Sequence, residues 1–264
     1  MGGLFAWGYA QGLADPVIHR TVLPMRGLSG PVRIALVSDS HMSYPDMPPE
    51  RLARIVQIVN AQRPDLILLA GDYIGEDKLF TRAPTEAEAV APLAGLRAPL
   101  GVYAVLGNHD NVTMRVARRV IRALEGSGIH VLENEIADVP GLMIGGASPY
   151  SRGARGGSVG GLIERFEKVQ GPRLLLTHSP DLLTRLQQKP ELLLTGHTHC
   201  GQVRLFGRPV ASATHIAPHL YCGRYELGPN AVLIASGGLG TSRLPIRFFT
   251  PPDFWMITLV PARS

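Results

Sequence analysis

Residues 32–41 read VRIALVSDSH, a mainly apolar run that stops abruptly on an aspartate and a histidine. Apolar runs of this length, bounded by turn residues, are typical of strands that are buried on both faces. In open α/β sheets, ligands bind beyond the carboxyl ends of such strands. Four further runs end in the same way, at Gly71-Asp72, Gly107-Asn108-His109-Asp110, Thr177-His178 and Gly196-His197-Thr198-His199. Together the five strand ends predict a site for two metal ions at one edge of a sheet.

The segments around these strands predict the rest of the architecture. Apolar residues at helical spacing indicate crossover helices at 49–62 and 85–96, which give right-handed βα units and a parallel sheet core. After residue 129 the runs become shorter, with Pro140-Gly141 as the turn of a hairpin. Two packed sheets covered by helices are therefore the most economical architecture. Further strands are expected at 129–135, 139–144, 202–206, 231–235 and 254–260.

The composition is that of an ordinary globular protein, with 264 residues, 45% hydrophobic and 18% charged. One large domain over 31–264, after an N-terminal extension over 1–30, fits this length better than two small domains. Two cysteines do not make a disulfide framework, so we expect Cys200 to be a small buried side chain and favour a reducing compartment. Its position beside a histidine also allows a redox-sensitive role. The glycine-rich segment 151–161 is expected to be a mobile loop, either a connection or a lid.

The net charge of +5 favours anionic partners. Part of it is concentrated on a predicted amphipathic helix at 114–125, whose polar face carries arginines. Such a run is commonly a solvated helix face, and the alternative is a platform for phosphate or acidic lipid head groups. Because no aromatic interleaving or nucleic-acid motif accompanies the arginines, no specific nucleic-acid partner is expected. The arginines concerned are Arg115, Arg118, Arg119 and Arg122.

The first residues are apolar and aromatic over 4–10, but this stretch is far shorter than the roughly 20 residues that span a bilayer. It also lacks the basic start and long apolar core of a secretory signal. An interfacial anchor, the remnant of a spanning helix and a packed terminus all stay open. We expect a cytoplasmic protein with peripheral association at the inner membrane.

The residue types at the strand ends suit adjacent divalent ions. Asp39 and His41 stand two positions apart in a turn, so both can face one ion of Zn, Mn or Fe. Asp72 can bridge two ions because a carboxylate has two oxygens, and Asn108 supplies a neutral carbonyl oxygen. Taken singly, each residue has an ordinary explanation as a helix cap or turn residue, but their joint order does not. The remaining donors are His178, His197 and His199.

In this order, the motifs D-x-H, G-D, G-N-H-D, a lone His and G-H-x-H over residues 32–200 resemble the calcineurin-like metallophosphoesterase family. The resemblance implies an α/β fold, a four-layer α/β/β/α sandwich of two mixed sheets flanked by helices. Segments 196–205 and 238–248 resemble its bacterial YkuE/YaeI-type branch, whose relatives include enzymes that cleave the pyrophosphate of UDP-2,3-diacylglucosamine. Members usually begin with a membrane-spanning helix. The chain departs from the family at Ser40, where Leu is usual, and at Cys200, where Gly is usual, which leaves the substrate more open than the chemistry.

The resemblance also implies roles for individual residues. A hydroxide that bridges the two ions would attack a phosphodiester or pyrophosphate. His109 should face the leaving oxygen as proton donor or transition-state stabiliser, oriented by Asp110, unless it is a hydrogen-bonded turn histidine. The first ion is assigned to Asp39, His41, Asp72 and His199, and the second to Asp72, Asn108, His178 and His197. Arg204, Arg243 and Arg247 are candidates for gripping a substrate phosphate, with surface charge pairing as the alternative.

Other functions compete with this one. A purple acid phosphatase needs an iron-binding Tyr three residues after Asp72, where this chain has Gly75, and Tyr73 stands too early. A non-catalytic metal-binding scaffold predicts missing ligands, and none is missing from the motifs. A broad-specificity phosphodiesterase or phosphatase on small soluble substrates or nucleotides remains the main alternative to a lipid-linked nucleotide substrate.

Overall fold

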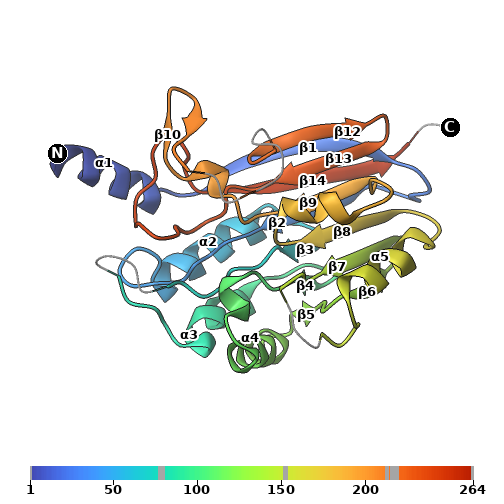
Figure 1. The fold of residues 1–264 in the computed structure, drawn as a ribbon, viewed down its shortest axis with the longest axis horizontal. Helices are drawn as coiled ribbons and strands as arrows, with labels where there is room; N and C mark the ends of the chain where they lie inside the picture. The colour runs from blue at the N-terminus through green and yellow to red at the C-terminus, as the bar shows by residue number, and fades with distance from the viewer. Residues whose placement is uncertain (1, 77–80, 151–153, 212–213, 215–219, 263–264) are drawn as a thin grey trace.

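Two six-stranded mixed sheets lie face to face in the computed structural model, which describes residues 2–76, 81–150, 154–211, 214 and 220–262 (Figure 1). The first sheet has the order β1 (Val17–Met25), β14 (Asp253–Pro261), β2 (Val32–Val37), β3 (Leu66–Leu69), β4 (Val102–Ala104) and β5 (His130–Val131). The second has the order β12 (Gly223–Gly228), β13 (Ala231–Ala235), β9 (Leu192–Thr195), β8 (Arg173–Thr177), β7 (Leu142–Ala147) and β6 (Glu135–Val139). A short ribbon pairs β10 (Arg204–Leu205) with β11 (Arg208–Pro209).

Helices cover the outer face of each sheet. The α-helices are α1 (Gly2–Leu13), α2 (Pro49–Ala61), α3 (Glu86–Val90), α4 (Met114–Gly126) and α5 (Val159–Glu167). Short 3-10 helices are η1 (Ala91–Gly95), η2 (His109–Asn111), η3 (Pro180–Arg185) and η4 (His199–Gly201).

Three hydrophobic cores separate the layers. In β2, Ile34 and Leu36 enter the core between the sheets, while Ala35 and Val37 enter the core beneath α2 and α4. The third core lies between the second sheet and α5, where Phe166 packs in the same cluster as residues of β8 and β9. The layer order is therefore α/β/β/α, and the predicted fold class is confirmed.

Parallel pairing brings the carboxyl ends of several strands to the same edge. β2, β3, β4 and β5 run parallel in the first sheet, and β7, β8, β9 and β13 do so in the second. Within the first sheet, the Asp39 N–H donates to the Gly71 carbonyl at 2.9 Å. Between the sheets, the His197 N–H donates to Asp39 Oδ2 at 2.9 Å. The ends of both sheets thus meet in one place.

The predicted crossover helices form close to the expected bounds, and local capping explains where they begin. α2 starts on Pro49, at a helix position that needs no N–H donor. Thr85 and Glu88 form a capping box at the start of α3. The hydroxyl of Thr113 accepts a hydrogen bond from the Val116 N–H at the start of α4.

The N-terminal stretch contributes a helix and a strand that the sequence did not indicate. β1, within the expected 1–30 extension, pairs in parallel with β14 and so belongs to the first sheet. In α1, the Trp7 ring lies 5.3 Å from the rings of both Phe248 and Phe249. Among the described residues, none of the helices has the length and apolar character that crossing a membrane requires.

Two expectations were wrong. α5 begins at Val159, so Gly160 and Gly161 lie in a helix and not in a loop, because the Ser158 hydroxyl accepts from the Gly161 N–H and caps it. Residues 151–153 of that segment lie outside the described residues. Cys200 is buried as expected, but it forms a disulfide with Cys222, 22 residues away. The reason for favouring a reducing compartment is thereby removed.

Candidate metal centre

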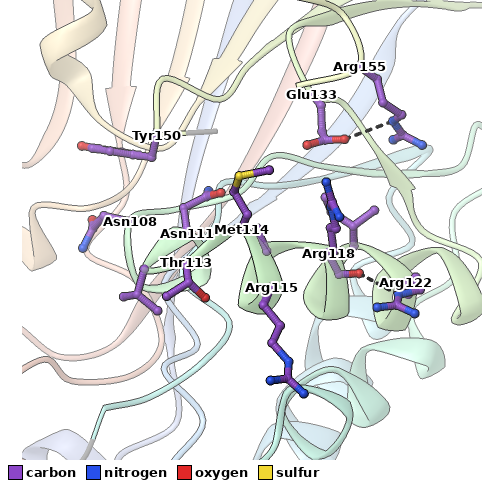
Figure 2. Close-up of a pocket in the computed structure, with 13 residues that line it drawn as sticks. Asn108, Asn111, Thr113, Met114, Arg115, Arg118, Arg122, Glu133, Tyr150 and Arg155 are labelled. Atoms are coloured by element: carbon purple, nitrogen blue, oxygen red, sulfur yellow. Dashed lines mark hydrogen bonds and ion pairs between the residues drawn. The ribbon is translucent and has the colours of Figure 1, made fainter. Parts of the chain in front are cut away.

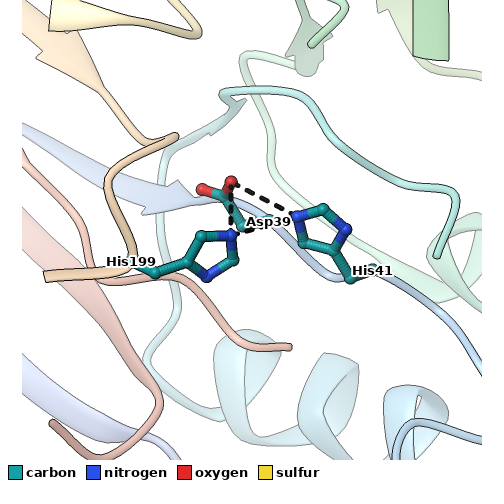
Figure 3. A group of neighbouring side chains, drawn as sticks. All are labelled: Asp39, His41 and His199. Carbon is teal, nitrogen blue, oxygen red and sulfur yellow. Dashed lines mark hydrogen bonds and ion pairs between the residues drawn. The ribbon is translucent and has the colours of Figure 1, made fainter. Parts of the chain in front are cut away.

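Asp39, His41 and His199 form a first cluster, in which one potential ligand atom of each lies within 4.8 Å of the others (Figure 3). Asp39 Oδ1 is 3.8 Å from His41 Nε2 and 3.5 Å from His199 Nε2. The two imidazole nitrogens are only 3.1 Å apart. Buried nitrogen and oxygen donors gathered in this way are typical of a site for a divalent cation.

Asp72, His178 and His197 form a second cluster that adjoins the first. Asp72 Oδ2 is 3.1 Å from His178 Nε2, and this nitrogen is 3.1 Å from His197 Nδ1. The same carboxylate oxygen lies 3.4 Å from His41 Nε2 in the first cluster. Asp72 therefore stands between the two clusters.

The charges of the centre are set by burial and by these close contacts. Burial opposes ionisation of Asp39 and Asp72, yet the surrounding histidines hold the pKa of each carboxyl well below its usual range. Burial also disfavours a charged His178, but the Asp72 carboxylate raises its pKa to about 9. At His199 burial prevails and lowers the pKa well below the ordinary value. Two ionised carboxylates buried among imidazoles are an electrostatic setting for cations.

The backbone at the strand ends is strained. Asp39, His41, Asp72, His197 and His199 all have positive φ, between 39° and 71°. Side chains rarely adopt this left-handed region, and such strain persists only where the surrounding structure imposes it. These turns therefore position the side chains of the centre at a cost in backbone energy.

Glycines allow the turns to approach one another. A Cβ on Gly107 would lie 2.0 Å from Asp72 Oδ1, and a Cβ on Gly196 would lie 1.7 Å from Ser38 Oγ and 2.3 Å from Asp39 Oδ2. All three separations are far below a normal contact, so only glycine fits at these positions.

The donor set fits a bound metal. Among the described residues, the buried Oδ1 of Asn108 has no hydrogen-bond partner, as expected of an oxygen that a cation would satisfy. The Nδ1 of His178 donates to the Ala70 carbonyl at 2.6 Å, so Nε2 faces the cluster, where a bound cation would take the place of its proton. Carboxylate, amide and imidazole donors together suit Zn, Mn or Fe.

Residues 32–201, more than half of the chain, match the family model for calcineurin-like phosphoesterases. The chain belongs to this family. Phosphoesterases of the family are metal-dependent, and the chain is accordingly a metal-dependent phosphoester hydrolase.

Curated relatives share the sequence over most of the chain. It is 29% identical over 280 residues to an uncharacterized metallophosphoesterase, YkuE of Bacillus subtilis, covering 96% of this chain and 89% of that protein. It is 29% identical over 252 residues to the phosphodiesterase YaeI of Escherichia coli, covering 88% and 83%. A Danio rerio transmembrane protein with a metallophosphoesterase domain is 29% identical over 274 residues, but the chain spans only 60% of its length.

Solved structures show the same fold at low sequence identity. TT1561 of Thermus thermophilus aligns with a TM-score of 0.50 and 14% identity over 79% of this chain and 90% of that chain.

In the phosphoesterase centre, His109 lies beside the clusters, and a residue other than Asp110 faces it. The His109 N–H donates to Asp72 Oδ1 at 2.9 Å, and its Nδ1 is 3.8 Å from Glu76 Oε2. Asp110 instead accepts from the backbone N–H groups of Asp72, Tyr73 and Gly107 at 2.7 to 2.9 Å. The expected orientation of His109 by Asp110 is therefore wrong, since both oxygens of this carboxylate are engaged with the backbone. Glu76 was missed because it follows no apolar run.

The three candidate arginines occupy different places. Arg247 is fully buried and donates to the carbonyls of Gly237, Gly240 and Thr250, so the expectation that it grips substrate is wrong. Arg204 donates to the Tyr221 hydroxyl at 3.2 Å and lies over that ring. Arg243 is exposed, and its N–H donates to Glu76 Oε1 at 2.7 Å, which places it near His109. Of the three, Arg243 stays the best-placed candidate.

Two tyrosines help to define the centre. The hydroxyl of Tyr73 donates to the Val105 carbonyl at 2.8 Å, and burial raises the pKa of this phenol. Tyr73 therefore has a structural role and stays protonated. The ring of Tyr150 lies 6.2 Å from that of His178 and 6.4 Å from that of His197. Sequence reasoning did not find Tyr150, because it lies after β7, whose end carries no family motif.

Proposed function

We propose that the chain hydrolyses a phosphodiester or pyrophosphate bond with two divalent ions held side by side, as Mn, Zn, Fe or a mixture. The observation that carries the proposal is the shared carboxylate of Asp72, whose Oδ2 lies 3.4 Å from His41 Nε2 and 3.1 Å from His178 Nε2. One ion would be held by Asp39, His41, Asp72 and His199, and the other by Asp72, Asn108, His178 and His197.

When bound, the two ions activate a water molecule as the nucleophile and neutralise the phosphate oxygens. The protein must still supply a proton to the leaving oxygen, and His109 is the group in place to do so. Its backbone N–H is held by Asp72 Oδ1, and Glu76 faces its Nδ1. Glu76 thereby orients the ring, and the backbone of Arg243, which is bound to Glu76, would bring its guanidinium within reach of the leaving group.

A lipid-linked nucleotide such as UDP-2,3-diacylglucosamine is the natural substrate that we propose. Its support is the resemblance of segments 196–205 and 238–248 to the YkuE/YaeI-type branch. A broad-specificity phosphodiesterase on small soluble substrates is the alternative.

An exposed apolar surface supports the lipid substrate and peripheral association at a membrane. It includes Leu4 of α1, 66% exposed, and Phe206, at the turn between β10 and β11 and fully exposed. Phe249 is also exposed and links these two segments. Its ring contacts that of Trp7 in α1, and the carbonyl of the preceding Phe248 accepts a hydrogen bond from the Arg204 N–H in β10. The uncharged α1 and the β10–β11 ribbon project from the same end of the molecule (Figure 1). Exposed aromatic and aliphatic side chains of this kind favour a lipid interface.

The function is tested by metal analysis together with a substrate panel. Mn-loaded protein should bind two ions per chain and hydrolyse bis-p-nitrophenyl phosphate. Two bound ions without turnover of any phosphoester would favour a non-catalytic scaffold. Hydrolysis of simple diesters with no action on UDP-2,3-diacylglucosamine would rule out the lipid-linked nucleotide and leave the broad-specificity alternative.

A further inference from the structure

A groove of about 970 Å³ opens beside the metal centre and has no role in the proposed reaction. Asn108 and Tyr150 line it at the end next to the centre, and Glu133 and Arg155 line it at the other (Figure 2). α4 forms its floor. A substrate whose phosphorus lies at the centre would therefore extend its organic part along α4.

Arginines of α4 line the groove without acidic partners. In the described part of the chain, no carboxylate pairs with Arg118 or Arg122. Arg118 rises from α4 into the same space as Met114, whereas the side chain of Arg115, which also lines the groove, extends in another direction (Figure 2). Arg122 is held by its Nε, which donates to the Arg118 carbonyl at 3.1 Å. These two guanidinium groups thus add uncompensated positive charge to one stretch of the groove.

On either side of these two arginines the groove has a different character. At the far end, Arg155 is paired with three carboxylates, those of Glu125, Glu133 and Glu135, with N···O distances of 2.6, 3.2 and 3.7 Å, so this end has an excess of acidic groups. Between the centre and Arg118, Met114 and Ala117 present apolar surface. With a helix rise of 1.5 Å per residue, Arg118 lies about 6 Å and Arg122 about 12 Å along the axis from Met114.

We propose that this groove binds a second anionic group of the substrate, a phosphate or a carboxylate, through Arg118 and Arg122. Arginine suits this role because its planar guanidinium donates two parallel hydrogen bonds to either anion. The inference rests on the proposed function for the position of the reacting phosphorus. The substrate would then be a phosphoester whose organic part carries a second anionic group, separated from the reacting phosphorus by a short apolar spacer.

Direct binding of two phosphonates to the metal-loaded protein tests the groove. Butane-1,4-bisphosphonate carries a second anion and butylphosphonate does not, and neither is hydrolysed. Calorimetry should show that wild type binds the bisphosphonate more than tenfold tighter. In Arg118→Gln/Arg122→Gln this preference should fall by about five- to tenfold, the contribution of exposed charge-assisted hydrogen bonds. The matched control is Arg119→Gln, on the same helix but paired with Glu86 outside the groove, which should keep the preference.

A preference of only about twofold for the bisphosphonate in wild type would overturn the inference. Either of its two identical phosphonate groups can bind the metal centre, and this alone doubles the apparent affinity. An equal preference in the double variant and in wild type would also overturn it. Neither outcome depends on turnover. If the wild type binds the bisphosphonate as expected but hydrolyses no phosphoester, the proposed function fails while the anion site stands.

Discussion

At the scale of single residues, Asp72 and His109 divide the proposed chemistry between holding metal and moving a proton. Asp72 is buried between the two clusters, and His109 is held by its backbone to the same carboxylate. Four of the backbone contacts around them come from Asp110, which the sequence marked but for a different role. A motif can therefore identify a residue of the site without showing what its side chain touches.

Asp72→Asn should reduce both bound metal and turnover. The amide keeps the shape of the side chain but removes the charge that faces His41 and His178, and turnover should fall by about a thousandfold or more. Metal per chain would be measured by mass spectrometry, with the exposed Asp138→Asn as the matched control. Full metal content and normal turnover in Asp72→Asn would contradict the shared carboxylate.

His109→Ala should keep its metal and lose activity, because a positioned general acid contributes about a hundredfold or more. The loss should be larger for an alkyl phosphodiester than for a p-nitrophenyl ester, whose leaving group needs little protonation. His130→Ala, at an exposed histidine stacked on Tyr103, is the control. Unchanged rates on both substrates would remove His109 from the mechanism.

At the scale of elements, the strand ends and their turns position the site, and this part was predictable from sequence. β2, β3, β8 and β9 are buried on both faces, so each is a mainly apolar run that ends at its functional turn. β1 was not predictable, because it is an edge strand in which most residues are exposed or half-buried and because it contains Pro24. The start of α5 was hidden by its glycines, and the disulfide partner of Cys200 lies too far along the chain for spacing to reveal it.

Gly107→Ala should disrupt the turn after β4, since the new Cβ would lie 2.0 Å from Asp72 Oδ1. Such overpacking costs about 1–3 kcal/mol, and the displaced carboxylate should also weaken metal binding. Gly126→Ala, at the end of α4, has no atom within 4 Å of the added carbon and should be neutral. Thermal unfolding and metal titration of both variants provide the test, and equal behaviour would refute the close-approach argument.

Cys222→Ser should destabilise the segment that carries His199, because the disulfide links the adjacent Cys200 to the residue just before β12. Closing a loop of this length stabilises a fold by about 3 kcal/mol. Urea unfolding of oxidised wild type and of the variant would measure the difference. A free energy of unfolding that does not change on substitution would show that the bond contributes nothing to the fold.

At the scale of the whole molecule, the metal centre lies where the two sheets meet, and apolar side chains project from one end of the protein. Both features come from segments far apart in the sequence: Asp39 meets His197 between the sheets, and Trp7 meets Phe249 on the surface. The sequence marked the first through its motifs. It did not mark the second, because α1, the β10–β11 ribbon and residues 244–249 carry no shared pattern.

Liposome cosedimentation tests the surface. Wild type should bind vesicles of anionic phospholipid, and Phe206→Ser/Phe249→Ser should bind at least tenfold more weakly, since burying one such ring contributes about 1.5–3 kcal/mol. Val22→Ser, at an exposed residue of β1, is the control for loss of exposed apolar surface elsewhere. Equal binding by the double variant would exclude this surface as the contact with lipid.

The central claim is that two ions share Asp72, and anomalous diffraction from Mn-loaded crystals tests it most directly. The account predicts two anomalous peaks per chain, one among Asp39, His41 and His199 and one among Asn108, His178 and His197, with Asp72 touching both. A single peak, or two peaks that do not share Asp72, would contradict it.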